Sequence, residues 1–311
     1  MTQTIEPGSF AFVINVGRLT DAASYTIVPG HELRRATPNE IVRIKASLES
    51  VGPTPRFQYA RLWEQRWPHH SGPVEGAPES EWRYFVIAFE GNNQTLAKIQ
   101  SAFELTPKEL EVGFAVMSVG GGYGTTWTPG RLFHVLENVG QTASFFVDVT
   151  AEDVTEVQNI YSQLEEHDPR MMDIQGLLLQ LGGLKSLHHS SPLRFLGYFA
   201  ILESLLTHSP KPSDPYDSIT RQVKTKVALL DRRFSRPTDY ARFRGASRDK
   251  IWTAMYLYRS NVAHGGTPDF SKELRLLVNH ESALQLVKET VKAVIRQALN
   301  EPQLLLDLKD C

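Results

Sequence analysis

The chain has 311 residues, of which 41% are hydrophobic and 22% are charged, and its formal net charge at pH 7 is −2. This composition is typical of a globular protein with a large apolar core, and it excludes disordered and collagen-like chains. No stretch approaches the roughly 20 apolar residues of a membrane span, and the first residues lack the features of a secretory leader. The single cysteine, Cys311, cannot form an internal disulfide or a cysteine-based metal site. We therefore expect a cytoplasmic protein with no membrane association and, from its length, two domains.

The first half of the chain shows a mixture of strand and helix signals. Short runs rich in aromatic and β-branched residues predict strands at 10–14, 25–28, 82–89, 112–119 and 143–149. One helix has a well-specified start, because Thr37 can cap it, Pro38 can open it and Glu40 can complete a capping box. A further helix is predicted at about 94–103, and 69–78 is a loop by composition. We expect a mixed α/β domain over residues 1–168.

The second half of the chain carries only helix signals. Helices are predicted at about 172–188, 192–207, 217–232, 249–264 and 272–300. The segments between them are rich in proline, glycine and serine, which do not continue a helix. Such short connections favour antiparallel neighbours in a helical bundle. The predicted fold class is therefore α+β, with an all-α domain over residues 169–311.

The predicted helix at 249–264 carries the most informative residues. Its apolar positions recur at helical spacing and form one stripe, which consists of Ile251, Met255, Tyr258 and Val262. Arg259 lies beside this stripe, where an unpaired guanidinium would cost several kcal/mol. His264 lies in the last turn, and Gly265 can take the left-handed conformation that ends a helix. Five residues turn an ideal helix roughly 140° beyond one full turn, so Arg259 and His264 do not share a face. Joint action requires a second chain or a distorted last turn.

An acidic partner for Arg259 is available in the predicted helix at 192–207. That helix is apolar almost all round, which predicts burial within the bundle. Glu203 falls within its apolar surface, where a lone carboxylate would be costly. An ion pair between Glu203 and Arg259 would satisfy both charges and fix the direction of the guanidinium.

These two helices resemble the HEPN superfamily and, within it, the Apea-like branch. The resemblance rests on YRSNVAHG at 258–265, with its arginine, four residues, histidine and glycine, and on FAILESLL at 199–206, with its acidic residue. It covers about 170–300. It implies a homodimeric, metal-independent endoribonuclease without a cofactor, in which the RNA's own 2′-hydroxyl attacks the adjacent phosphorus. Activity in phage defence or as a toxin is also implied.

The resemblance also implies roles for individual residues. His264 is suited to move the proton and Arg259 to stabilise the phosphorane charge. Many active members have a polar Asn, Asp or His directly after the arginine, whereas this chain has Ser260 there and Asn261 next. Asn261 can orient the histidine from three residues before it. Glu203 is expected to act mainly through structure.

The distribution of charge favours an anionic ligand near Arg259. Residues 221–260 hold 11 Lys and Arg against three acids, a balance of +8, and residues 1–220 carry −9. Such a basic stretch is the electrostatic signature of phosphate-backbone binding. Tyr240 and Phe243 lie within it and are candidates to stack on unpaired bases. The predicted RNA-binding residues are Arg232, Arg233, Arg236, Arg242, Arg244, Arg248 and Lys250.

Other interpretations remain open from the sequence. Arg259 and His264 can be structural in a non-catalytic module that binds RNA, a nucleotide or a protein, and a regulatory partner protein is conceivable in either case. The basic stretch can be a solvated face. A hydrolase centred in the first domain finds no supporting motif. The histidine pairs at 69–70 and 188–189 lack the spacing of a metal site, and the glycine-rich 120–124 is predicted to be a turn.

Overall fold

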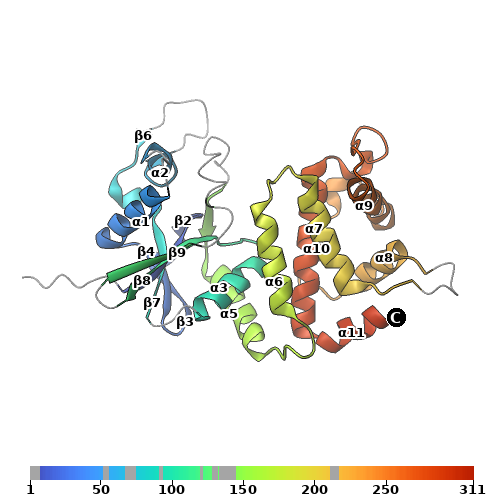
Figure 1. The fold of residues 1–311 in the computed structure, drawn as a ribbon, viewed down its shortest axis with the longest axis horizontal. Coiled ribbons are helices and arrows are strands. Elements are labelled where there is room, and N and C mark those ends of the chain that lie inside the picture. Colours follow the sequence, from blue (N-terminus) through green and yellow to red (C-terminus); the bar gives the residue numbers. More distant parts are fainter. Residues whose placement is uncertain are drawn as a thin grey trace, which may run out of the picture. The chain divides into compact units, whose positions relative to one another are not determined.

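The computed structural model describes residues 8–51, 56–66, 75–90, 94–119, 122–127, 132, 145–210 and 217–311. The chain divides into two compact units, Met1–Ser162 and Gln163–Cys311. The first unit contains an antiparallel sheet and the described elements of the second are helical, so the predicted α+β class is confirmed (Figure 1). The division falls within helix α5 (Ala151–Glu166), six residues before the predicted end of the first domain.

Six strands of the first unit form one antiparallel sheet in the order β3-β4-β7-β1-β8-β9. Their bounds are Ser24–Val28 (β3), His31–Arg35 (β4), Phe85–Phe89 (β7), Ser9–Val13 (β1), Val112–Val119 (β8) and Gly122–Trp127 (β9). Two smaller pairs join β10 (Val147–Val149) to β2 (Val16–Leu19) and β5 (Gln65–Arg66) to β6 (Glu75–Gly76). All residues of β1 are buried, as expected for the centre of a sheet covered on both faces.

Most of the predicted strands of this unit occur in the structure. The strand expected at 143–149 is formed at Val147–Val149, and residues 143–144 lie outside the described part. The prediction of a turn at 120–124 is wrong for residues 122–124, because Gly122–Trp127 is the edge strand β9. Residues 120–121 and the histidine pair at 69–70 lie outside the described residues.

Helix α1 (Pro38–Ser50) begins as the sequence predicts. Thr37 Oγ1 accepts from the Glu40 amide at 3.3 Å and a Glu40 carboxylate oxygen accepts from the Thr37 amide at 2.7 Å, so the capping box is confirmed. The unit also contains helices α2 (Arg56–Trp63) and α3 (Gln94–Leu105) and the short turn η1 (Glu79–Glu81).

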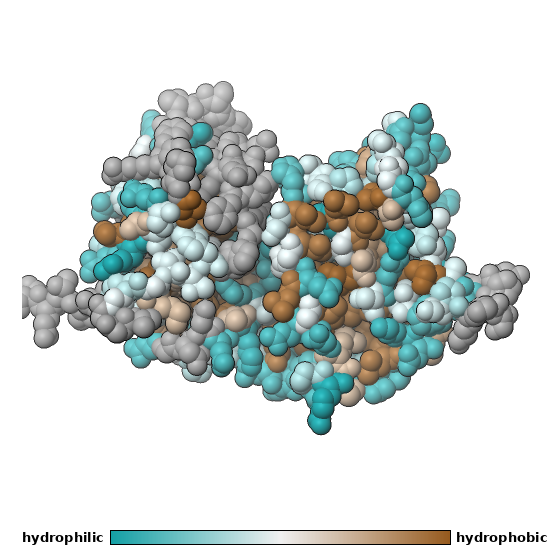
Figure 2. All heavy atoms as spheres, in the orientation of Figure 1, coloured by the Kyte–Doolittle hydropathy of each residue, from teal (hydrophilic) through white to brown (hydrophobic). Residues whose placement is uncertain are grey.

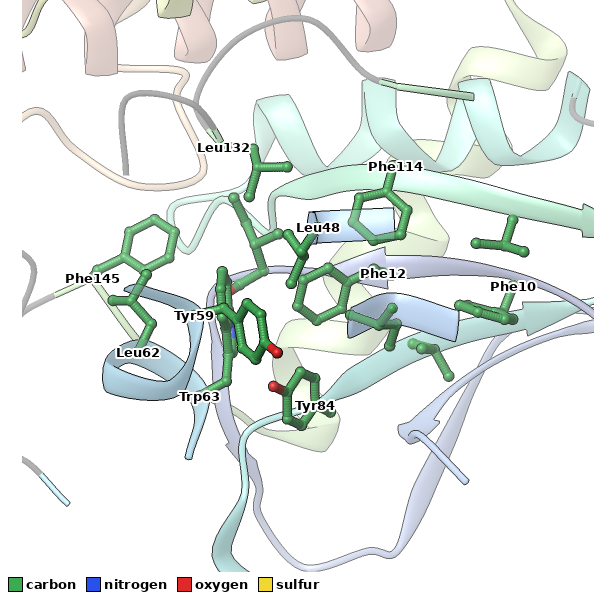
Figure 3. Close-up of a cluster of buried hydrophobic side chains, with 14 residues drawn as sticks. Phe10, Phe12, Leu48, Tyr59, Leu62, Trp63, Tyr84, Phe114, Leu132 and Phe145 are labelled. Carbon is green, nitrogen blue, oxygen red and sulfur yellow. The ribbon is translucent and has the colours of Figure 1, made fainter. Parts of the chain in front are cut away.

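Aromatic side chains form the centre of the first unit (Figure 3). The Phe12 ring lies 5.3 Å from that of Trp63 and 5.4 Å from that of Phe114, measured between ring centroids. The Trp63 indole donates to the Ile14 carbonyl at 3.0 Å, so its one polar atom is satisfied inside the core. Alternate residues of β1 thus pack against helices α1 and α2.

The second unit is built around helix α7, which packs against α6, α8, α9, α10 and α11. The bounds of its elements are Ile174–Gly183 (α6), Leu184–Ser186 (η3), Pro192–Leu206 (α7), Ile219–Leu230 (α8), Ala241–Phe243 (η4), Arg248–Ala263 (α9), Arg275–Leu277 (η5), His280–Asn300 (α10) and Pro302–Asp310 (α11). The expected burial of α7 is confirmed on most of its surface. In the described part of the chain, no helix is long and apolar enough to cross a bilayer.

The helix predicted at 272–300 begins eight residues later than expected. Val278 has φ +66° and ψ −62°, and the Asn279 amide donates to the Leu277 carbonyl at 2.7 Å, which closes a γ-turn. The Asn279 side chain then caps α10 by accepting from the Ser282 amide at 2.8 Å. The first eight predicted residues are therefore a turn-rich connection, and a β-branched residue sits in a strained conformation at its end.

Candidate functional site

The candidate site lies on helix α9, which the predicted apolar stripe anchors in the helical unit. Ile251, Met255 and Tyr258 are fully buried, and Val262 at the end of the stripe is half-buried. The Tyr258 ring stacks on Phe195 of α7 with centroids 4.2 Å apart. The stripe therefore fixes which side chains of α9 face α7 and which face solvent.

The predicted ion pair between Arg259 and Glu203 is confirmed. Arg259 Nη2 donates to Glu203 Oε2 at 2.9 Å, and the two side chains are 28% and 14% exposed. The guanidinium also lies against the Tyr256 ring, with Cζ 5.8 Å from the centroid. The ion pair is monodentate: Arg259 Nε and Glu203 Oε1 are both buried and have no hydrogen-bond partner. The carboxylate thus directs a cation that keeps donor capacity for a further anion.

His264 ends helix α9 in a geometry that two glycines make possible. Gly265 has φ +71°, as the sequence predicts, and its amide donates to the Val262 carbonyl at 3.1 Å. The Gly266 amide donates to the Asn261 carbonyl at 2.8 Å, which completes a Schellman motif. The His264 side chain is exposed. Its imidazole is accessible to a ligand and to water at the free end of the helix.

The structure brings two of the four predicted catalytic residues together and leaves the other two apart from them. In the described chain, no hydrogen bond joins His264 to Arg259, Glu203 or Asn261. Asn261 contributes its backbone carbonyl to the Schellman motif, and the expected hydrogen bond from its side chain to His264 is not formed. Arg259 and His264 leave α9 in different directions, as the helical spacing predicts.

A second polar contact next to the site was not predicted from the sequence. The Tyr258 hydroxyl lies 2.5 Å from His280 Nδ1, and His280 Nε2 lies 2.9 Å from the His189 carbonyl. The carbonyl only accepts, so Nε2 carries the proton and the tyrosine donates to Nδ1. Burial raises the pKa of Tyr258 to about 12. A histidine 22 residues away shows no local pattern that would have revealed this contact.

Three of the predicted RNA-binding arginines form ion pairs with carboxylates. Arg233 contacts Glu301 at 2.6 Å, Arg242 contacts Glu289 at 3.0 Å and Arg248 contacts Asp231 at 3.0 Å. Such pairs direct these three arginines toward carboxylates of their own chain. The exposed members of the set are Arg232, Arg233, Arg236, Arg244 and Lys250.

The two aromatic residues proposed to stack on bases are Phe243, which is buried, and Tyr240, which is half-buried. Phe243 is 1% exposed and belongs to the core, so its predicted stacking role is wrong. The Tyr240 hydroxyl accepts from the Trp252 indole at 3.1 Å, and burial raises the pKa of this tyrosine. Tyr240 thus contacts α9 through Trp252, and Phe243 is buried at the short turn η4, so neither ring is an open platform.

A basic groove runs along the outer face of α8. Of the predicted RNA-binding residues, Arg232 alone is among the described residues that line it. The groove has a volume of about 620 Å³. Lys224 is held in it by Asp249, with Nζ 2.7 Å from the carboxylate, and by the Thr253 hydroxyl at 3.1 Å. Its lining residues are Ser218, Thr220, Arg221, Lys224, Thr225, Ala228, Leu229, Arg232 and Asp249.

Comparisons of the chain with protein families, with curated proteins and with solved structures find no match. Among the described residues, no three His, Cys, Asp or Glu side chains gather as a metal-binding group. The histidine pair at 188–189 stacks with centroids 4.3 Å apart, and His188 Nδ1 lies 2.7 Å from the Ser190 hydroxyl. The groups available for chemistry at the candidate site are therefore Arg259 of α9, Glu203 of α7 and His264 at the end of α9.

Proposed function

We propose that this protein is a metal-independent endoribonuclease of the HEPN type that acts on RNA in the cytoplasm. The observation that carries the proposal is the Glu203–Arg259 pair, which holds a partly exposed guanidinium on the helix that ends at the exposed His264. A directed cation and an accessible imidazole are the two groups that phosphodiester cleavage by an internal nucleophile requires. They also match the motif on which the resemblance to the Apea-like branch rests.

The proposed reaction assigns one task to each group. The 2′-oxygen attacks the adjacent phosphorus and loses its proton, and the bond from phosphorus to the 5′-oxygen breaks as that oxygen takes up a proton. The products are a 2′,3′-cyclic phosphate and a 5′-hydroxyl. His264 moves the proton, and Arg259 neutralises the charge that develops on the phosphoryl oxygens. Glu203 acts through Arg259 as a positioning residue.

A homodimer accounts for the different directions of Arg259 and His264. A second copy can place its own motif opposite the first, so that one phosphate meets groups from both chains. The helical unit offers apolar surface for such an association, because Figure 2 shows hydrophobic side chains gathered over α6, α7 and α10. Leu179 of α6 is 72% exposed and Leu193 of α7 is 58% exposed. Exposed apolar surface of this kind favours association between chains.

The first unit has no assigned chemistry and is proposed to sense a trigger or to select the substrate. Residues 1–162 hold 12 Lys and Arg against 18 Asp and Glu, a net charge of −6, opposite to the +8 of residues 221–260. Such an acidic portion disfavours direct contact with a nucleic acid. A restraining partner protein and a role in phage defence or as a toxin belong to the same proposal.

The test is cleavage of labelled tRNA and mRNA in EDTA by the wild type and by Arg259→Ala and His264→Ala variants. Each variant should lose about 100-fold or more in rate, and wild-type products should end in a cyclic phosphate. Arg170→Ala removes an arginine whose side chain is 88% exposed, and this matched control should cleave normally. Equal cleavage by all four proteins contradicts the proposal. If the wild type does not cleave RNA but binds it with an affinity that falls as salt is added, the result supports a non-catalytic binding module instead.

A further inference from the structure

The α8 groove has the chemistry of a phosphate site. Among the described residues that line it, three are cationic, Arg221, Lys224 and Arg232, and one is a carboxylate, Asp249. Hydroxyl groups of Ser218, Thr220 and Thr225 add donors along the same face. Arginine, lysine and hydroxyl side chains are the groups that contact phosphate and sugar oxygens in nucleic-acid complexes.

The arrangement along the helix suits a chain of phosphates better than a single anion. Arg221 lies in the first turn of α8 and Arg232 lies two residues after its end, so the two cations are 11 residues apart, which corresponds to about 16 Å of helical rise. Lys224 lies between them and is held in place by Asp249 and Thr253. In the first turn of α8 the Arg221 amide donates to Ser218 Oγ at 3.3 Å, and the amides of Ile219 and Thr220 have no intrahelical acceptor, which favours an anion at that end.

The apolar part of the groove lining indicates which contacts RNA bases could make there. Ala228 and Leu229 lie in the groove, Leu229 is 48% exposed, and none of the described lining residues is aromatic. This described lining offers bases apolar contacts, without a stacking platform or a dense set of base-reading groups. Recognition would follow the backbone and would depend little on sequence.

We propose that the α8 groove binds the sugar–phosphate backbone of single-stranded RNA and holds the substrate away from the bond to be cut. The identification of RNA rests on the proposed function. The 15 residues of α9 from Asp249 to His264 place the groove about 22 Å from the histidine along the helix. The groove therefore acts on substrate affinity and does not touch the reacting atoms. Variants of the groove should change KM and leave kcat unchanged.

Asp249 gives the proposal its sharpest test. Its carboxylate is 72% exposed in the groove and competes with phosphate for Lys224. Removing that charge should tighten RNA binding, whereas a mainly structural Lys224–Asp249 pair would give no gain. A matched control exists in the exposed pair Asp168–Arg170, at 2.7 Å elsewhere in the same unit.

The experiment measures fluorescence anisotropy of a labelled 2′-O-methyl RNA strand, which cannot be cleaved, against salt concentration. Arg232→Glu should weaken binding about tenfold or more and lower the salt slope by about 0.7 or more, and Arg232→Lys should restore both. Asp249→Asn should tighten binding about threefold by removing one opposing charge. The controls Arg170→Glu and Asp168→Asn should bind as the wild type does.

Two results separate the groove from the catalytic proposal. Equal losses in Arg232→Glu and Arg170→Glu, or no gain in Asp249→Asn, would overturn the groove while cleavage by the wild type could still stand. Normal cleavage by Arg259→Ala would overturn the catalytic proposal while groove binding of the methylated strand stood. Circular dichroism of Arg232→Glu should match the wild type, because Arg232 is exposed.

Discussion

Replacement of Glu203 by alanine should destabilise the helical unit by about 2 kcal/mol. Two unit charges 4 Å apart attract by about 4 kcal/mol at an effective dielectric constant of 20. Desolvation of both groups offsets part of this attraction, and the 14% and 28% exposure of the two side chains places the pair between a buried and a surface ion pair. The alanine variant leaves Arg259 partly buried beside apolar side chains without its counter-charge. Glu203→Gln keeps the shape and one acceptor, so its cost should be about 1 kcal/mol.

The assay is urea unfolding of a double-mutant cycle, followed by circular dichroism, with Glu203→Ala, Arg259→Ala and the double variant. The coupling energy between the two positions should be about 1–2 kcal/mol, because the single changes remove the same contact. The exposed pair Asp168–Arg170 supplies a parallel cycle in which coupling should be near zero. Coupling below about 0.3 kcal/mol at Glu203 and Arg259 would refute the reasoning that this pair fixes the guanidinium.

Three further predictions concern stability. Tyr258→Phe should lose about 1 kcal/mol at neutral pH through its contact with His280, and it should also lessen the fall in melting temperature between pH 10 and 12. In that range the unfolded tyrosine, but not the folded one, releases its proton. Burial opposes ionisation of Glu40, but hydrogen bonds with Arg34 outweigh it and lower the pKa of the carboxyl. Acid titration followed by circular dichroism should show stability lost below about pH 4.5, with a smaller loss in Glu40→Gln. At Val278, glycine should be more stable than alanine in thermal melts by about 1 kcal/mol, since only glycine adopts φ +66° without strain; the reverse order would contradict the strained turn.

Much of the fold follows from local patterns in the sequence, and the misses have physical causes. β1 and β8 are apolar runs and are found, whereas β4, with the sequence HELRR, holds its place through pairing with β3 and β7. Strand formation there depends on neighbours distant in the chain, which no local propensity contains. Helix α5 was missed although Thr150 and Asp153 exchange capping hydrogen bonds at its start. The spacing of a threonine at 150 and an acidic residue three positions later would have predicted this helix start.

The site was predictable wherever burial alone dictated the partner. A glutamate on the buried helix α7 and an arginine beside the core face of α9 each needed an opposite charge, and the structure pairs them. The left-handed Gly265 followed from the same kind of local rule. The beginning of α10 did not, because the γ-turn at Val278 goes against the backbone preference of its residue type.

The basic stretch shows why a charge balance along a sequence is not a charge balance in space. Glu203, Glu289 and Glu301 lie outside residues 221–260 but form ion pairs with Arg259, Arg242 and Arg233, which lowers the balance of that stretch from +8 to +5. An arginine that neutralises a carboxylate of its own chain offers little net attraction to a phosphate. Attraction for a phosphate must then come from places where cationic side chains outnumber the carboxylates beside them. The α8 groove gathers three cationic side chains, of which Lys224 pairs with Asp249 and Arg232 is exposed, so RNA affinity should follow the groove more closely than the count of arginines in the stretch.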